Sequence, residues 1–118
     1  MLVLPGGMPG TNYLRDHEGL AELLKKQYEA GKWVAAICAA PSVFGDLGIL
    51  NGKEAVCYPG FEERLTGATI GEGTVAVTDH VITSRGMGTA IDFAAALIAR
   101  LQDEKKAEEI KASIIYRQ

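Results

Sequence analysis

The sequence has no long apolar run and no concentration of positive charge. Its 118 residues are 47% hydrophobic and carry a formal net charge of −3. No run reaches the length that spans a bilayer, and the first residues show no charged segment followed by an apolar core. No dense stripe of lysine and arginine is present to attract nucleic acid or an anionic membrane. We therefore expect no nucleic-acid partner and no membrane, and we expect a small molecule as the partner.

Cysteine and histidine are scarce, with two residues of each. No metal-ligand cluster and no cofactor fingerprint is apparent, so we expect neither a metal nor a cofactor. The spacing of Cys38 and Cys57 is not a disulfide framework, and we predict that Cys57 is a core strand residue rather than a resolving thiol. His17 stands in a helix-start sequence and His80 in a predicted hairpin turn. We interpret both as solvated residues without a catalytic role.

The chain also lacks repeats, low-complexity tracts and an interdomain linker, which predicts a single domain over residues 1–118. Its elements alternate as βα units do. Strands are predicted at 2–4, 33–37, 54–58, 74–78 and 81–84, the last two forming a hairpin around 79–80. Helices are predicted from a cap at Asp16 to a stop at Gly31, from Pro41 to a stop at 45–48, after a cap at Thr89, and from about Glu104 to Tyr116. The buried stripe of the helix after Thr89 is predicted to be Ile91, Ala94, Ala95, Ile98 and Leu101.

The most informative segment is the apolar run that ends at Cys38. Val, Ile and Ala precede this cysteine, as in a strand buried on both faces, and Pro41 suits the first turn of a following helix. Cys38 would then lie in the turn, where helix N-terminal amides favour a thiolate, the nucleophilic form. Ala39 and Ala40 are small enough for a sharp strand-to-helix elbow. The alternative is that Cys38 is a buried cysteine acting as a small hydrophobe.

A glycine-rich turn follows the first apolar segment, which reads Leu-Val-Leu-Pro-Gly-Gly. Glycines allow close approach and positive φ, so main-chain N–H groups of Gly6 or Gly7 could hold an oxygen anion. Parallel strands in open α/β sheets bring such turns together at their carboxyl ends. An ordinary βα turn is the alternative explanation for either glycine.

Three motifs in order resemble the ThiJ/PfpI family, in the branch of the Parkinsonism-associated deglycase and bacterial thiazole-biosynthesis-type proteins. They are Leu-Pro-Gly-Gly, then Ala-Ile-Cys-Ala-Ala-Pro with its cysteine 31 residues after Gly7, and then Thr-Ser-Arg-Gly-Met-Gly-Thr-Ala at 83–90. The resemblance implies a flavodoxin-like three-layer α/β sandwich with a mainly parallel sheet. It also implies a homodimer in the reducing cytoplasm, with Cys38 as the reactive thiol and the amides of Gly7 and Ala39 lining an oxyanion pocket.

The chain departs from the family pattern in two ways. Family members have an N-terminal βαβ-containing section before the Pro-Gly-Gly strand, and a helix there supplies a glutamate that hydrogen-bonds the cysteine. We therefore expect a domain incomplete at its N-terminal side, whose sheet edge is covered by a homo-oligomer or by a complementing N-terminal segment. The second departure is Tyr58, where several branches place a histidine. An unperturbed phenol titrates near 10, which disfavours a Cys-His dyad.

We assign Tyr58, Pro59 and Arg85 to the substrate side of the pocket. The Tyr58 hydroxyl would donate a hydrogen bond to a ligand oxygen, or its ring would serve only as an aromatic wall. Arg85, at the end of a strand, could hold a carboxylate or phosphate, or form an ion pair near the dimer contact.

Three functions are consistent with this sequence. In the first, the Cys38 thiolate adds to an α-oxoaldehyde such as methylglyoxal, as in a glyoxalase or deglycase, with the oxyanion held by backbone amides. In the second, peroxide oxidises Cys38 reversibly in a redox-sensing or protective binding protein. The third is a thiazole-biosynthesis-type or protease-like protein, for which no catalytic histidine is at hand. We prefer the first.

Overall fold

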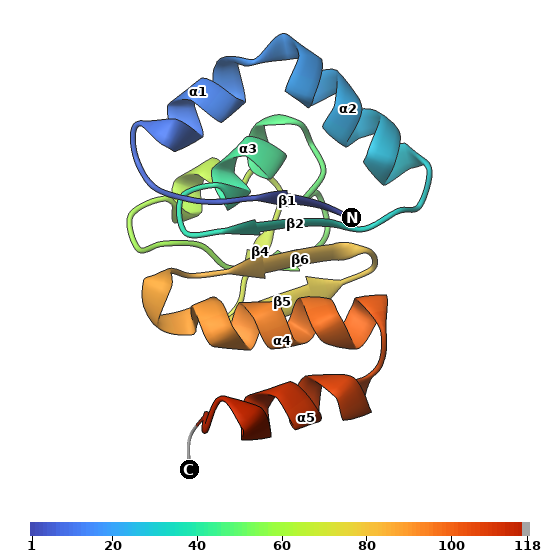
Figure 1. The fold of residues 1–118 in the computed structure, drawn as a ribbon. Coiled ribbons are helices and arrows are strands. Elements are labelled where there is room, and N and C mark those ends of the chain that lie inside the picture. Colours follow the sequence, from blue (N-terminus) through green and yellow to red (C-terminus); the bar gives the residue numbers. More distant parts are fainter. Residues whose placement is uncertain (117–118) are drawn as a thin grey trace.

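The computed structural model describes residues 1–116 and shows a central four-stranded sheet between helices (Figure 1). The strand order is β1 (Leu2–Leu4), β2 (Val34–Ile37), β6 (Val81–Ser84) and β5 (Val75–Thr78). β1, β2 and β6 run parallel, with Leu4 opposite Ala36 and Ile37 opposite Ser84. β5 is antiparallel to β6. This arrangement confirms the predicted flavodoxin-like α/β fold with a mainly parallel sheet.

Helices cover both faces of the sheet, and residues of β2 alternate between the two cores. Val34 and Ala36 pack with the core beneath α1 (Gly10–Asp16), α2 (Glu18–Glu29) and α3 (Pro41–Asp46). Ala35 packs instead with Phe93 of α4 (Ala90–Leu101) on the other face. Successive side chains of a strand point to opposite faces, so one short strand contributes to both layers. Because both faces are covered, the strand has a continuous apolar sequence.

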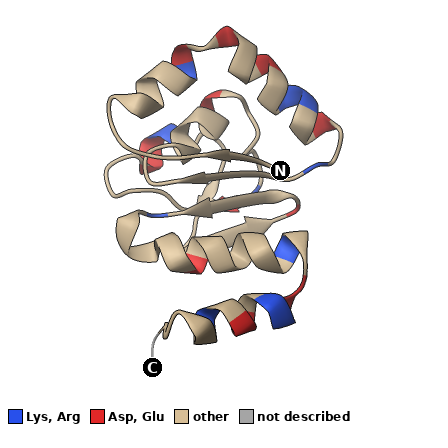
Figure 2. Ribbon diagram, viewed as in Figure 1, with Lys and Arg blue, Asp and Glu red and all other residues tan. Residues whose placement is uncertain are grey.

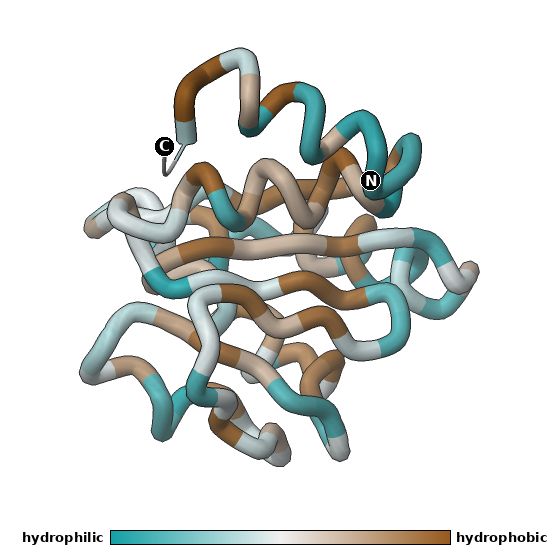
Figure 3. The backbone as a smooth tube through the Cα atoms, turned by 90° about the horizontal axis from the view of Figure 1, so that it is seen from below, coloured by the Kyte–Doolittle hydropathy of each residue, from teal (hydrophilic) through white to brown (hydrophobic). Residues whose placement is uncertain are grey.

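The remaining elements lie at the margins. α5 (Glu104–Ser113) packs against α4, and the short strands β3 (Glu54–Ala55) and β4 (Thr69–Ile70) form a separate parallel pair. Two single turns of 3₁₀-helix occur at Glu62–Arg64 and Met87–Thr89. Charged residues gather on the outer helices (Figure 2), and apolar segments run through the middle of the molecule (Figure 3). Within residues 1–116, no helix has both the length and the apolar character needed to cross a membrane.

Several local predictions are confirmed. Gly31 (φ +75°) terminates α2, with its N–H bonded to the Tyr28 carbonyl and the Lys32 N–H bonded to the Gln27 carbonyl. Pro41 occupies the first turn of α3, which ends at Asp46 as predicted. β5 and β6 form the predicted hairpin around Asp79 and His80.

Three local predictions are wrong, and one helix was missed. α1 was not expected, and the cap of α2 is His17, which accepts the Leu20 N–H at 3.0 Å in place of Asp16. Cys57 is buried in the core as predicted, but it lies beyond the end of β3 and is not a strand residue. α5 ends at Ser113, before Tyr116.

The predicted buried stripe of α4 is the largest error. Ala95 is buried as predicted, but Ile91 and Leu101 are exposed by 44% and 59%. Phe93, which was not in the predicted stripe, is 6% exposed and packs on the sheet. The helix is apolar on more than one side, so helical spacing alone could not identify the buried face. Thr89 precedes α4 but does not cap it through its side chain, which bonds the preceding turn instead.

Candidate functional site at the carboxyl ends of the parallel strands

Cys38 lies immediately after β2, on the turn that leads into α3. Its φ is +67°, a left-handed conformation that is uncommon for a residue with a side chain. Both of its backbone polar groups are bonded. The N–H donates to the Ser84 carbonyl at 3.1 Å, and the carbonyl accepts the Tyr58 N–H at 2.8 Å. These contacts from two other segments hold the unfavourable backbone conformation, a pattern that often accompanies functional sites.

Gly6 approaches Cys38 so closely that a side chain would not fit there. A Cβ atom at this position would lie 2.3 Å from the Cys38 Cβ and 2.7 Å from the Ile37 carbonyl oxygen, and 3.2 Å from the Cys38 Sγ. The glycine is therefore required by contact and not by its own φ. Gly7, in contrast, has φ +90° and open space where a Cβ would be.

Cys38 opens onto a hollow of about 360 Å³, and its side chain is partly exposed. In Figure 1 the three parallel strands run toward the left, and α4 begins on that side. The hollow thus lies at the carboxyl ends of the strands, where open α/β sheets bind ligands. It is lined by Gly6, Gly7, Ile37, Cys38, Gly86, Met87 and Ala90.

The structure places two of the three predicted oxyanion residues in the lining of the hollow: Gly6 and Gly7 line it, whereas Ala39 is 1% exposed and is not part of the lining. In the described part of the chain, we find no backbone acceptor for the N–H groups of Gly6, Gly7 or Ala39. Donors of this kind stabilise an oxyanion when they lie about 3 Å from the position where the charge develops. Gly6, Gly7 and Ala39 therefore remain the candidates for an oxyanion pocket.

A chain of hydrogen bonds fixes the turn on the opposite wall of the hollow. The N–H groups of Arg85 and Gly86 donate to Thr89 Oγ1 at 3.2 and 3.1 Å. Thr89 Oγ1 lies 2.7 Å from Ser84 Oγ, which donates to the Thr74 carbonyl at 2.6 Å. Since the Ser84 carbonyl also accepts the Cys38 N–H, one buried serine connects the elbow to this wall.

The three residues assigned to substrate binding lie beside the hollow and are not part of its lining. The Tyr58 side chain is half exposed, and its ring lies 3.4 Å from the point where a Cβ on Gly86 would be. Pro59 is exposed on the same segment. Arg85 Nε donates to the Cys57 carbonyl at 3.4 Å, which anchors the arginine to the Tyr58 segment. Their ligand roles stay predictions.

The second thiol, Cys57, has different surroundings. It is 2% exposed, and burial raises its pKa from 9.0 to about 11. The nearby Glu62 carboxylate also raises this pKa, whereas the Arg85 guanidinium lowers it. The pKa of Glu62 is itself lowered, because its carboxylate accepts backbone N–H groups of Glu62 and Gly60.

Neither histidine lies in the lining of the hollow. His17 is exposed at the start of α2, as predicted. His80 is not simply solvated, because its ring stacks on Tyr28 at 4.6 Å between centroids and Nε2 lies 2.9 Å from the Tyr28 carbonyl oxygen. Among the residues that the structure describes, no group of three or more His, Cys, Asp or Glu could hold a metal ion.

Sequence reasoning missed the apolar side of the hollow, formed by Ile37, Met87 and Ala90. It also missed the connection of Ser84 to Thr89. The signal available in the sequence was the Thr-Ser-Arg-Gly-Met-Gly-Thr motif itself, because a polar turn after a buried strand lies next to the turn after β2.

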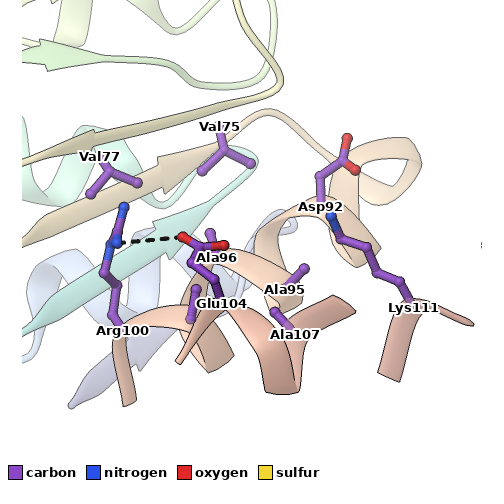
Figure 4. Close-up of a pocket in the computed structure, with 10 residues that line it drawn as sticks. Val75, Val77, Asp92, Ala95, Ala96, Arg100, Glu104, Ala107 and Lys111 are labelled. Carbon is purple, nitrogen blue, oxygen red and sulfur yellow. Dashed lines mark ion pairs between the residues drawn. The ribbon is translucent and has the colours of Figure 1, made fainter. Parts of the chain in front are cut away.

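A second hollow of about 260 Å³ lies between β5, α4 and α5 (Figure 4). Val75 and Val77 face alanines of the two helices across it, and Arg100 pairs with Glu104 at 3.7 Å. Its described lining contains no thiol, hydroxyl or imidazole group. The hollow beside the Cys38 thiol therefore remains the candidate site.

Comparison with known proteins gives a consistent answer. The model of the DJ-1/PfpI family matches residues 1–100. Protein DJ-1 homolog B of Arabidopsis thaliana is 40% identical over 99% of this chain and 27% of its own length. The glutathione-independent glyoxalase DJR-1.2 of Caenorhabditis elegans is 33% identical over 93% of this chain and 59% of its own.

Solved structures agree with this result. The oxidised DJ-1 of Toxoplasma gondii superposes with a TM-score of 0.89 at 40% identity, covering 96% of this chain and 62% of that one. The chain thus spans less than two thirds of the length of these relatives. From the order of its motifs, its fold and these matches, the chain belongs to the DJ-1/PfpI family.

Proposed function

We propose that this chain acts on small electrophiles as a glyoxalase or deglycase, with Cys38 as the nucleophile. The observation that carries the proposal is the partly exposed Cys38 on a positive-φ turn, facing a hollow that is also lined by Gly6 and Gly7, whose N–H groups have no backbone acceptor among the described residues. A thiolate is a strong nucleophile, and amides that are already in place stabilise charge without reorganising. The name of the glyoxalase from Caenorhabditis elegans, 33% identical, supports the same reaction class.

The first step is addition of the Cys38 sulfur to the aldehyde carbon of methylglyoxal. A C–S bond forms while the carbonyl π electrons move to oxygen, and the amides of Gly6, Gly7 and Ala39 would stabilise this oxyanion. A proton then moves from the former aldehyde carbon to the neighbouring carbon, so that the first is oxidised and the second reduced. Water finally cleaves the resulting thioester to give lactate and the free thiol. The net change is the addition of one water, and no cofactor is consumed.

The proton transfer is the demanding step in this mechanism. In the part of the chain that the structure describes, the lining of the hollow holds no carboxylate or imidazole group. The Tyr58 phenol beside the hollow is a hydrogen-bond donor. Because general acid or base catalysis typically contributes about 10²–10⁴-fold, we expect addition to be fast relative to lactate formation.

The test is cofactor-free conversion of methylglyoxal to lactate by the chain, Cys38→Ser and Cys57→Ser. Activity should be abolished in Cys38→Ser and retained in Cys57→Ser, which controls for general loss of thiol. Tyr58→Phe should cost about 0.5–1.5 kcal/mol if its hydroxyl contacts the ligand. Turnover that survives in Cys38→Ser would refute the covalent mechanism.

A second function is supported by the oxidised state named for the relative from Toxoplasma gondii. In it, the Cys38 thiolate attacks peroxide, the O–O bond breaks, and sulfenic acid and hydroxide form. Peroxide modification of Cys38 that a thiol reductant reverses, without any turnover of methylglyoxal, would favour this redox function. The homo-oligomer or complementing segment and the cytoplasmic location stay predictions.

A further inference from the structure

The lining of the Cys38 hollow is apolar. Three glycines contribute only backbone, and the side chains that face the space besides Cys38 belong to Ile37, Met87 and Ala90. Within residues 1–116, no charged side chain belongs to this lining. A substrate carboxylate that entered the hollow would find no cationic side chain in this lining, so its transfer from water is less favourable than that of a neutral group of similar size.

The adjacent cation, Arg85, is not part of the lining. Arg85 precedes Gly86 of the lining, but its guanidinium Nε donates to the Cys57 carbonyl. The geometry therefore favours neutral substrates and disfavours those that carry a carboxylate on the reacting carbon chain.

Met87 combines a fixed backbone with a free side chain. Its side chain is 93% exposed, and it lies at the mouth of the hollow. The turn beneath it is held by the bonds of Arg85 and Gly86 to Thr89 Oγ1. Methionine is flexible and polarizable, and its sulfur makes favourable contacts with aromatic rings. Burial of its apolar surface against an apolar group of a ligand is favourable in free energy.

The volume of the hollow also exceeds what a three-carbon aldehyde needs. The hollow has a volume of about 360 Å³ and is open to solvent, so methylglyoxal leaves part of it unfilled. A larger apolar group on the substrate would fill this space against Ile37 and Met87.

We propose that Met87 determines specificity in the Cys38 site, and that the site prefers electrophiles bearing an aryl or branched alkyl group. In the proposed function this means phenylglyoxal-type α-oxoaldehydes over glyoxal and over glyoxylate. The proposal rests on Cys38 as the reacting atom, and it adds the residue that contacts the rest of the substrate.

The test uses alkylation as well as turnover, because alkylation does not depend on the proposed function. N-Benzyl-iodoacetamide and iodoacetamide react alike, by attack of the Cys38 thiolate on carbon with loss of iodide. We measure the ratio of their rate constants at Cys38 by mass spectrometry in the chain, in Met87→Gln and in Leu101→Gln. Leu101 is the matched control, since it is an exposed apolar residue at the far end of α4.

We expect the benzyl reagent to react faster than iodoacetamide with the unaltered chain, and we expect Met87→Gln to reduce the ratio of the two rate constants about 5-fold. Leu101→Gln should leave the ratio unchanged. If turnover is measurable, Met87→Gln should raise the ratio of KM for phenylglyoxal to KM for glyoxal about 5-fold. A rate ratio that is the same in all three proteins would overturn the proposal.

The alkylation and turnover measurements distinguish the proposed specificity role of Met87 from the proposed glyoxalase reaction. Loss of the benzyl preference in Met87→Gln, in a chain without any glyoxal turnover, would support the specificity role and refute the glyoxalase reaction. Turnover of α-oxoaldehydes with an unaltered substrate preference in Met87→Gln would support the glyoxalase reaction and refute the specificity role of Met87.

Discussion

The two cysteines of this chain lie near one another in the fold but in opposite environments. Cys38 sits on a strained turn at the edge of an open hollow, and Cys57 is 2% exposed in the core with a pKa raised to about 11. They are close enough that Cys38 contributes to the pKa of Cys57. The comparison shows that backbone position and access to solvent, and not residue type, determine which thiol can react.

The largest effect on the difference between the two thiols is expected from a substitution that adds a side chain at Gly6. In Gly6→Ala the new methyl group would meet the Cys38 Cβ and the Ile37 carbonyl, so either the elbow or the turn must move. We expect at least a 10-fold slower alkylation of Cys38 and a loss of about 1–3 kcal/mol of stability, as for overpacked sites.

Gly10→Ala is the matched control, because a Cβ there meets nothing within 4 Å and the glycine has no positive φ. Both variants would be compared by thiol labelling and by urea unfolding. If Gly6→Ala labels at Cys38 as quickly as Gly10→Ala does, close approach of the two turns does not shape the site.

The second prediction concerns Cys57 and alkaline pH. Its folded pKa of about 11 lies above the ordinary value of 9.0, so the folded state keeps a proton that the unfolded chain releases. This contribution is fully present below pH 9 and is lost as the pH rises from about 9 to 11. Over this window the free energy of unfolding should fall by about 1–3 kcal/mol on account of Cys57.

Urea unfolding of the chain and of Cys57→Ala at several pH values measures the contribution of Cys57 as the difference between their free energies of unfolding. The fall between pH 9 and 11 should be shallower in Cys57→Ala, and Cys38→Ser should keep the steeper fall. Parallel curves for the chain and Cys57→Ala would contradict a strongly buried Cys57.

The smallest effect is expected from the charge next to Cys57. Glu62→Gln removes a negative charge that raises the Cys57 pKa and keeps an oxygen that can accept the Gly60 N–H. The Cys57 pKa should therefore decrease, as followed by thiolate absorbance in the Cys38→Ser background. Glu63→Gln is the control, since Glu63 is exposed and is not among the charges that shift Cys57. An equal or larger decrease in Glu63→Gln would assign the effect to general surface charge.

The elbow could be predicted from sequence because its causes are local. An apolar run of Val, Ala and Ile, a cysteine among small residues and Pro41 are sufficient to indicate strand, turn and helix in that order. The glycine turn was recognisable for the same reason, and the order of parallel strands brings the two turns together.

What the sequence could not predict depends on contacts between distant segments. α4 is apolar on several sides, so the choice of Phe93 over Ile91 for the core is made by the sheet beneath it. The Ser84 and Thr89 hydroxyls could each have faced solvent, and only the folded chain shows that they bond one another. The need for glycine at position 6 likewise comes from Cys38, far along the chain.

The most direct test of the central claim is the rate of iodoacetamide labelling at each thiol of the native chain across pH 6 to 10, resolved by peptide mass spectrometry. Because the reagent can reach the partly exposed Cys38 and burial raises the pKa of Cys57, we expect Cys38 to be labelled at least about 10-fold faster than Cys57 at neutral pH. Cys57 should become labelled only as the pH approaches its raised pKa or as the chain unfolds. Equal labelling of Cys38 and Cys57 in the folded chain at neutral pH would contradict the account.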